Sequence, residues 1–314
     1  MWTKLVVAHP RQPFSLNGSR SSTMRVGHLE SGRGSGVRSG TLLRVPPAFI
    51  PGVELSRRLY RDAVRPLLDD HYPGLAHTAA LIGHGSEVLG FDTVRSTDHD
   101  WGPRLHLFLH DDDLDEHGAG VSGLLAERLP ATIAGYPTNL PPVDGGRGTR
   151  HMRPVDGSLP IRHGVVVAAL DAWLTDHLGF DPRHGVTTLD WLATPTQVLA
   201  EVTAGAVFHD GLARLHPIRR QLAWYPDDLW RYLLACQWQR ISQEEPFVGR
   251  CGEVGDELGS AITAARLARD LMRLCLLLDR VYPPYGKWLG TAFARSPGAR
   301  RLAPALAAAV AATG

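Results

Sequence analysis

One stretch of the chain, GSEVLGFDTVRSTDHDW, contains two short motifs whose residue types could do phosphate chemistry. The first motif is Gly85-Ser86, whose hydroxyl and backbone N–H groups could bind a phosphate, particularly where a helix begins. The second motif is Asp-His-Asp, with carboxylates at Asp98 and Asp100. Paired carboxylates are hard oxygen ligands of the kind that Mg²⁺ prefers. The stretch therefore predicts a site for Mg²⁺ and a phosphate group.

Two predicted strands position these motifs. The apolar run at residues 79–82 is typical of a strand, and the Gly-Ser turn that follows it is expected to open a short helix. Asp98 and Asp100 lie on or just before a second strand, which continues through residues 105–109. Because side chains i and i+2 of a strand share a face, the two carboxylates are expected to project together. The alternative is a buried pair of aspartates that caps turns.

This arrangement resembles the nucleotidyltransferase superfamily of polymerase-beta type, whose pattern is an apolar strand, Gly-Ser, a short connection, and Asp-x-Asp on the neighbouring strand. Gly85, Ser86, Asp98 and Asp100 match all four positions. The amino-acid sequence of the stretch resembles one bacterial family, domain of unknown function 4037, more closely still. The later segments AWYPDDLWRY, CQWQRISQEE, GRCGEVGDELGS and YGKWLGTAFAR carry the same resemblance, which covers roughly residues 47–295.

The resemblance implies a third carboxylate. Members of the superfamily usually place one on a later strand, facing the first two, where it completes the metal site and can act as a base. The predicted strand at residues 162–170 carries no acid. Asp171 at its end is the nearest candidate for a catalytic role, although a helix N-cap role is equally open to it. Glu201 is a more remote candidate, and catalysis is weakened or lost if neither residue reaches the site.

Basic residues in the second half of the chain could bind a nucleotide triphosphate. The predicted helix at residues 259–281 carries Arg266, Arg269 and Arg273 on one face. Guanidinium groups bind phosphate bidentately, but an ordinary solvated basic face explains the same pattern. Lys287 follows in a tight turn. The chain resembles antibiotic nucleotidyltransferases, in which a helical C-terminal domain supplies basic residues to the nucleotide cleft, and Lys287 is the first choice for that role.

The length of 314 residues suggests two domains, each with a sizeable core. Residues 1–45 are rich in Ser, Gly and Arg and contain a single acid, which predicts a disordered tail. Residues 46–190 are expected to form a nucleotidyltransferase-like domain with a small mixed sheet. Residues 191–314 are expected to form an all-helical domain, so that the predicted fold class is α+β.

Composition narrows the possible partners. The formal net charge is +1, which gives no global basic field for a long nucleic acid. No apolar stretch approaches the ~20 residues that a membrane helix needs. The three cysteines are widely spaced and none belongs to a CxxC motif, so a reduced, cytoplasmic setting is the default expectation.

The leading hypothesis is a Mg²⁺-dependent nucleotidyltransferase that moves an NMP group from an NTP to an unidentified hydroxyl acceptor. ATP is the main candidate for the NTP. The acceptor could be a small molecule, a protein or a tRNA end. The alternative is a non-catalytic nucleotide-binding or partner-binding protein with the same fold. A third interpretation treats His99-Asp100 as a histidine-aspartate phosphohydrolase motif, but that chemistry needs further ligands on helices, and strand alternation would point His99 away from both acids.

Overall fold

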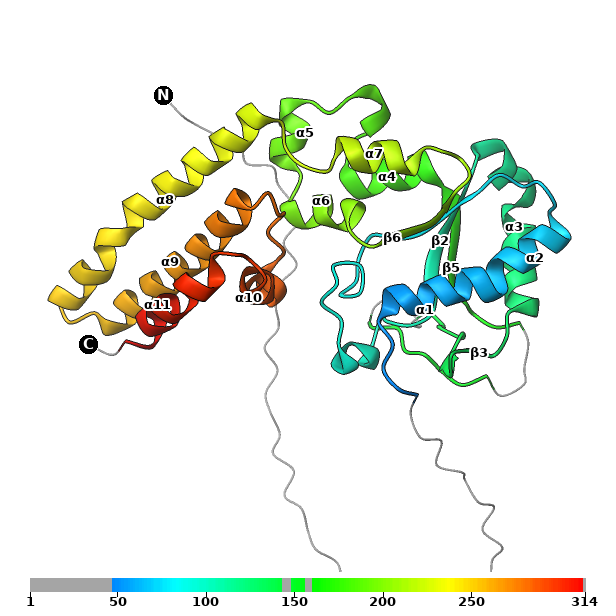
Figure 1. Ribbon diagram of the computed structural model, residues 1–314, viewed down its shortest axis with the longest axis horizontal. Helices are drawn as coiled ribbons and strands as arrows, with labels where there is room; N and C mark the ends of the chain where they lie inside the picture. Colours follow the sequence, from blue (N-terminus) through cyan, green and yellow to red (C-terminus); the bar gives the residue numbers. More distant parts are fainter. Residues whose placement is uncertain (1–46, 143–147, 156–159, 313–314) are drawn as a thin grey trace, which may run out of the picture. The chain divides into compact units, whose positions relative to one another are not determined.

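A mixed sheet of four strands, in the order β5-β2-β1-β6, forms the core of the part of the chain that precedes the long helix α8 (Asp227–Glu253) (Figure 1). The computed structural model describes residues 47–142, 148–155 and 160–312, so the predicted disordered tail lies outside the described residues. The strands of this sheet are β1 (Thr78–Leu81), β2 (Arg104–Leu109), β5 (Gly164–Ala169) and β6 (Ala206–Asp210). β1 is antiparallel to β2 and to β6, whereas β2 is parallel to β5. A separate two-stranded sheet pairs β3 (Thr132–Ile133) with β4 (Tyr136–Pro137).

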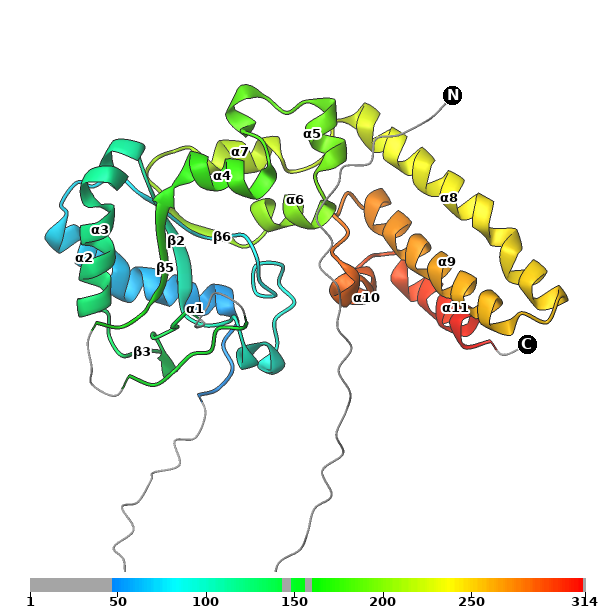
Figure 2. The same ribbon diagram turned by 180° about the vertical axis from the view of Figure 1, so that it is seen from behind.

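Helices cover both faces of the four-stranded sheet (Figure 2). One face carries α1 (Gly52–Leu59), α2 (Arg65–His71) and α3 (Asp111–Arg128), with a π-helical turn joining α1 to α2. The other face carries α4 (Leu170–Leu178), α6 (Thr196–Thr203) and α7 (Leu215–Gln221). Ala79 packs into the first core and its neighbour Ala80 into the second, as strand alternation requires. β1 is therefore buried on both faces, which explains why three of its four residues, Ala79, Ala80 and Leu81, are apolar.

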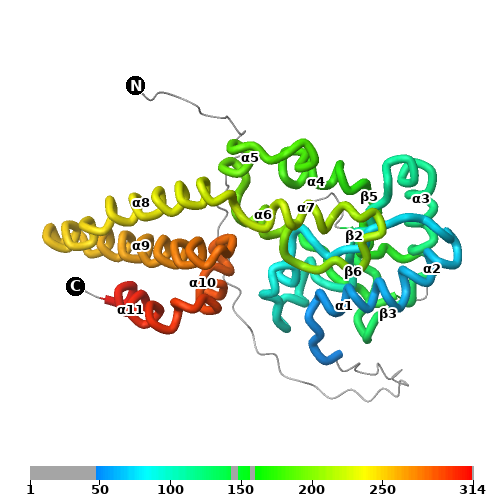
Figure 3. Tube along the Cα trace, turned by 45° about the horizontal axis from the view of Figure 1, so that its top comes forward, coloured from blue at the N-terminus to red at the C-terminus, as the bar shows by residue number. Residues whose placement is uncertain are grey.

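The C-terminal part of the chain is a group of long helices. These are α8 (Asp227–Glu253), α9 (Glu257–Leu278), α10 (Gly286–Ala294) and α11 (Ala299–Ala311), and a short helix, α5 (Thr188–Ala193), precedes α6. α8 and α9 lie side by side, and α10 and α11 pack against α9 (Figure 3). Side chains of α8 donate to backbone carbonyls of α9, including the Trp230 indole to Leu277 and the Gln237 amide to Asp270. None of the helices in the described ranges is long and apolar enough to cross a membrane.

The expected α+β class, with a small mixed sheet and a helical C-terminal region, is confirmed. The all-helical expectation beyond residue 190 differs from the structure in one element, because β6 pairs with β1. β6 has only five residues, AVFHD, and two of them are polar, so it shows little hydrophobic alternation. Gly205 and Gly211 flank the strand and are the one local signal of its limits. The boundary drawn between residues 190 and 191 therefore leaves one strand of the sheet in the predicted helical domain.

Candidate functional site

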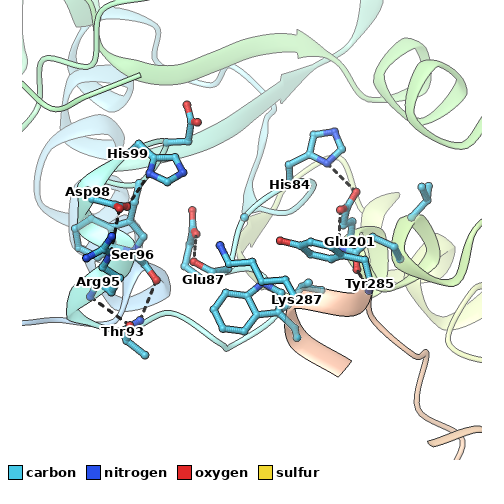
Figure 4. A pocket seen from close by; sticks show the side chains of 18 of the residues that line it. His84, Glu87, Thr93, Arg95, Ser96, Asp98, His99, Glu201, Tyr285 and Lys287 are labelled. Atoms are coloured by element: carbon cyan, nitrogen blue, oxygen red, sulfur yellow. Dashed lines mark hydrogen bonds and ion pairs between the residues drawn. The ribbon is translucent and has the colours of Figure 1, made fainter. Parts of the chain in front are cut away.

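A cavity of about 770 Å³ opens beside the C-terminal end of β1 (Figure 4). This volume lies within the ~300–1,000 Å³ typical of ligand pockets. Its walls come from the turn after β1, the segment before β2, helix α6 and the start of α10. Figure 4 shows Asp98 and His99 on one side of the cavity and His84 with Glu201 on the other, with Glu87 between them. Residues far apart in the sequence thus share one concave surface.

The Gly-Ser motif lines this cavity, but the local structure differs from the expected helix. Residues 83–90 form consecutive turns, in which the Phe91 N–H donates to the Ser86 carbonyl at 2.8 Å. Gly85 has a φ of +142°, a backbone conformation that residues with a side chain rarely adopt. A Cβ on Gly85 would also lie 2.7 Å from the Glu87 carboxylate. The turn therefore requires glycine at this position, and it presents the Ser86 side chain at the cavity wall.

A buried ion pair fixes this turn to β2. Glu87 is 1% exposed, and its carboxylate accepts the Arg104 Nε–H at 2.7 Å. The same guanidinium also donates to the main-chain carbonyl of His84. One arginine at the start of β2 therefore bonds both sides of the Gly-Ser motif. Neither Glu87 nor His84 was predicted to be part of the site, and the only sequence signal for them is that they flank Gly85-Ser86.

Asp98 and Asp100 both line the cavity, but they do not share a strand face. Asp98 ends a 3₁₀ helix, Val94–Asp98, and Asp100 has a φ of +47°, whereas β2 begins only at Arg104. The Thr93 side chain caps this short helix by accepting the backbone N–H of Arg95. The two carboxylates are therefore positioned by a capped turn and a bend rather than by strand alternation, which corrects the expected geometry.

Each aspartate makes specific contacts within this loop. One oxygen of Asp98 lies 2.7 Å from His99 Nδ1, and the other lies 3.4 Å from Arg95 Nε. His99 was expected to point away from the acids, and it instead contacts Asp98 and lines the cavity. Asp100 Oδ1 accepts the backbone N–H of Arg150 at 2.9 Å, and its own N–H donates to the Arg150 carbonyl at 2.7 Å. These reciprocal bonds fix Asp100 in its strained backbone conformation.

Asp171 lies in the first turn of α4, where it forms an ion-pair cluster. It is 7% exposed, and its carboxylate accepts hydrogen bonds from Arg183 at 2.6 Å and from Arg214 at 2.6 and 2.5 Å. Within the described ranges, the residues that line the cavity do not include it. Two guanidinium groups already neutralise this carboxylate through three hydrogen bonds. The structure therefore argues against Asp171 as the third carboxylate, and it shows no side-chain cap by Asp171 either.

Glu201 does reach the cavity, from α6. It is 3% exposed, and one of its oxygens accepts the Gln197 side-chain amide at 2.7 Å. Its other oxygen lies 3.0 Å from His84 Nδ1 and 3.1 Å from His177 Nε2. Burial alone would raise the pKa of Glu201, but the two imidazoles and the amide outweigh burial and lower this pKa to about 2. The same carboxylate raises the pKa of His84.

Of the predicted basic residues, Lys287 alone lines the cavity in the described part of the chain. It lies in the first turn of α10, with Nζ 4.9 Å from the ring centre of Trp288. Arg266 instead pairs with Glu244 on α8 at 2.6 Å, and Arg269 contacts Asp270 at 3.2 Å. These arginines bind acids of the helical region, so the structure does not bring them to the cavity.

Comparison with protein families gives a match for part of the chain. Residues 191–289 match the family model described as Domain of unknown function (DUF4037). This match supports the expected likeness to that family over residues 191–289, whereas the wider extent, over roughly residues 47–295, and the likeness to the polymerase-beta type superfamily stay predictions. Searches of curated proteins and of solved structures found no match.

Proposed function

We propose that the cavity binds a nucleoside triphosphate with Mg²⁺ and that the protein transfers the nucleotidyl group to a hydroxyl acceptor. The observation that carries this proposal is the gathering of Gly85, Ser86, Asp98, Asp100 and Lys287 on one cavity. These residues come from segments before β2 and from α10, and together they supply a hydroxyl, two carboxylates and an ammonium group. A polyphosphate with a hard cation complements that set in charge and in hydrogen bonding.

The donor set fits Mg²⁺. Asp98 and Asp100 offer oxygen only, and a carboxylate has about four lone-pair sites, so the contacts with His99, Arg95 and Arg150 leave capacity on both. Asp98 and Asp100 would hold the ion, which supplies charge neutralisation to the phosphates when bound.

The remaining residues bind and orient the nucleotide. The Ser86 hydroxyl, at the wall of the cavity, is placed to donate to a phosphate oxygen. Lys287 adds a point charge from α10, on an exposed side chain whose ammonium group lies over the Trp288 ring. Catalysis by such a site comes mainly from positioning and charge neutralisation, and the acceptor hydroxyl is brought to the α-phosphorus in line.

The second candidate is a nucleotide-binding protein without turnover. The observation that favours it is the position of Asp171, whose carboxylate is held by Arg183 and Arg214. Proton removal from an acceptor needs a base within ~3 Å, directly or through water. If the cavity provides no such base to the acceptor hydroxyl, nucleotide binding persists and nucleotidyl transfer does not occur.

Calorimetry with ATP and Mg²⁺, beside a pyrophosphate-release assay over a panel of hydroxyl acceptors, tests both candidates. Asp98→Asn and Asp100→Asn are expected to abolish Mg²⁺-dependent binding or turnover, and Lys287→Met to weaken nucleotide binding. Asp115→Asn is the matched control, because this aspartate is exposed on α3 and does not line the cavity. Wild-type nucleotide affinity in both Asp98→Asn and Asp100→Asn would contradict the assignment. Binding with no pyrophosphate release favours the second candidate.

A further inference from the structure

Three metal-ligating side chains converge at the wall of the cavity opposite Asp98 and Asp100. They are His84 from the turn after β1, His177 from the last turn of α4, and Glu201 from α6. One ligand atom from each lies within 4.8 Å of the other two. Figure 4 shows the His84 ring directed at the Glu201 carboxylate. The three come from separate elements of the fold, so no local sequence motif signals them.

Two atoms of this cluster are buried without a hydrogen bond. His177 Nε2 and Glu201 Oε2 lie 3.1 Å apart, yet neither has a hydrogen-bond partner in the described part of the chain. The His84 contact with Glu201 Oε2, at 3.0 Å, does not provide one either. The side chains of His177 and Glu201 are only 10% and 4% exposed. Buried polar atoms of this kind are costly unless something pairs with them, and a cation bound between them would pair with both.

We propose that His84, His177 and Glu201 bind one divalent transition-metal ion of the zinc class. Zinc takes imidazole nitrogen and carboxylate oxygen at ~2.0–2.2 Å, which places neighbouring ligand atoms of a tetrahedral site about 3.3–3.6 Å apart. Two observed separations, 3.0 and 3.1 Å, are a few tenths of an ångström shorter, and all three lie within 4.8 Å, so side-chain movements are enough to form the site. Two imidazoles and one carboxylate leave a fourth position, as in catalytic rather than structural zinc sites.

The cluster borders the cavity. The His84 side chain is 83% exposed and lines the cavity together with Glu201, whereas His177 does not line it. A metal ion bound by the three side chains would therefore lie next to whatever the cavity binds. Since the site carries one carboxylate and two neutral imidazoles, the bound ion would leave a net positive charge there, which suits an anionic ligand.

The surroundings of the site hold its ligands in place. The Gln197 amide donates to the other oxygen of Glu201 at 2.7 Å, and the His177 ring stacks on Trp173 with centres 4.7 Å apart. The Gly83 N–H donates to the Glu201 carbonyl at 2.8 Å, which joins the end of β1 to α6. Contacts of this kind orient metal ligands and raise affinity.

This inference does not depend on the proposed nucleotide site. Asp98 and Asp100 offer oxygen only and suit Mg²⁺, whereas imidazole nitrogen suits zinc and its neighbours. The two sites can therefore be tested apart, and either can fail without the other.

The test uses the full chain, freed of metal by a chelator and dialysed, with no nucleotide present. Zn²⁺ is titrated by calorimetry, and Co²⁺ is titrated by visible absorption, which reports nitrogen ligation. One tight site per chain is expected. His177→Gln and Glu201→Gln are expected to weaken it by about 100-fold or more, and Gln197→Ala by ~10–100-fold, as for outer-shell partners. Mg²⁺ at millimolar concentration is expected not to compete.

Two control variants and one further test variant complete the experiment. His117→Gln, on α3, removes an imidazole, and Asp98→Asn removes a carboxylate, but neither residue belongs to the cluster. Both variants are therefore expected to retain the Zn²⁺ affinity of the wild type. His84→Gln is the variant least able to disturb folding, because its side chain is largely exposed, and it is expected to weaken binding and change the Co²⁺ spectrum. Unchanged Zn²⁺ affinity in His84→Gln and Glu201→Gln, or no tight site in the wild type, would overturn the proposal.

Discussion

Removal of the Arg104 side chain is expected to destabilise the protein strongly, because it leaves the Glu87 carboxylate buried without its partner. Glu87 is 1% exposed, and the Arg104 side chain is 19% exposed, so the ion pair is largely shielded from water. Breaking one partner out of a buried ion pair costs about 3–5 kcal/mol, and the His84 carbonyl loses a donor worth a further ~1 kcal/mol. Arg104→Met is therefore expected to lower the free energy of unfolding by about 5 kcal/mol.

A second substitution, at Glu87, separates the energy of the ion pair from the other effects of removing the Arg104 side chain. Glu87→Gln keeps the shape of the side chain and removes its charge, so Arg104→Met should cost much less in the Glu87→Gln background. Urea denaturation followed by tryptophan fluorescence gives the four free energies of the double-mutant cycle. The coupling is expected to be at least ~2 kcal/mol, since residues in one buried network are not additive. Additive effects of the two substitutions, or a cost of Arg104→Met under ~1 kcal/mol, would refute the reasoning.

Three further predictions concern residues around the site. Asp171→Asn is expected to reduce stability by about 1–3 kcal/mol, since it weakens charge-assisted hydrogen bonds, and to leave ATP affinity in calorimetry unchanged; a loss of affinity would return this residue to the site. Burial lowers the pKa of His106 to about 3, whereas the unfolded chain titrates near 6.5, so this histidine favours unfolding as the pH falls below 6.5. Between pH 8 and pH 5 it is expected to remove about 2 kcal/mol of stability, and His106→Leu should lack that component in urea titrations at the two pH values. Gly205→Ala is expected to cost more than ~1 kcal/mol in the same assay, because φ is +69° and a Cβ would lie 2.0 Å from the Leu81 carbonyl oxygen; Gly249→Ala in α8, which meets nothing within 4 Å, is the control and should be neutral or stabilising.

The local motifs of the site could be read from the sequence, but their geometry could not. The apolar run before the Gly-Ser motif and the one after Asp-His-Asp predict neighbouring strands, and β1 and β2 do pair, with Ser86 and Asp98 lining one cavity. The strand-face argument for Asp100 failed for a local reason. Thr93 caps a 3₁₀ helix, and Arg150, fifty residues away, holds Asp100 at positive φ, because its N–H donates to the Asp100 carboxylate and its carbonyl accepts the Asp100 N–H. Local sequence propensity contains no information on the contact between Arg150 and Asp100.

The roles of charged residues far from the two motifs were the hardest to predict from the sequence. Asp171 forms ion pairs with Arg183 and Arg214, which lie on later segments, and Arg266 forms an ion pair with Glu244 on α8. A charge in a sequence is equally compatible with a ligand and with an ion pair, and only the three-dimensional neighbours decide between them. Lys287 was predicted from a family resemblance and a tight turn, and it lines the cavity because α10 begins one residue before it.

The segment that matches the family model and the motif segment before it form one site. Residues 191–289 contain Glu201 and Lys287, which line the cavity together with the Gly-Ser turn. Gln197 joins these walls, because its amide nitrogen donates to Glu201 and its amide oxygen accepts the backbone N–H of Tyr285 at 3.1 Å, at the start of α10. One side chain therefore positions both the carboxylate of the inferred zinc-class site and the helix that carries Lys287. It follows that the family match covers residues that matter for the cavity even though both motifs that first indicated phosphate chemistry lie outside it.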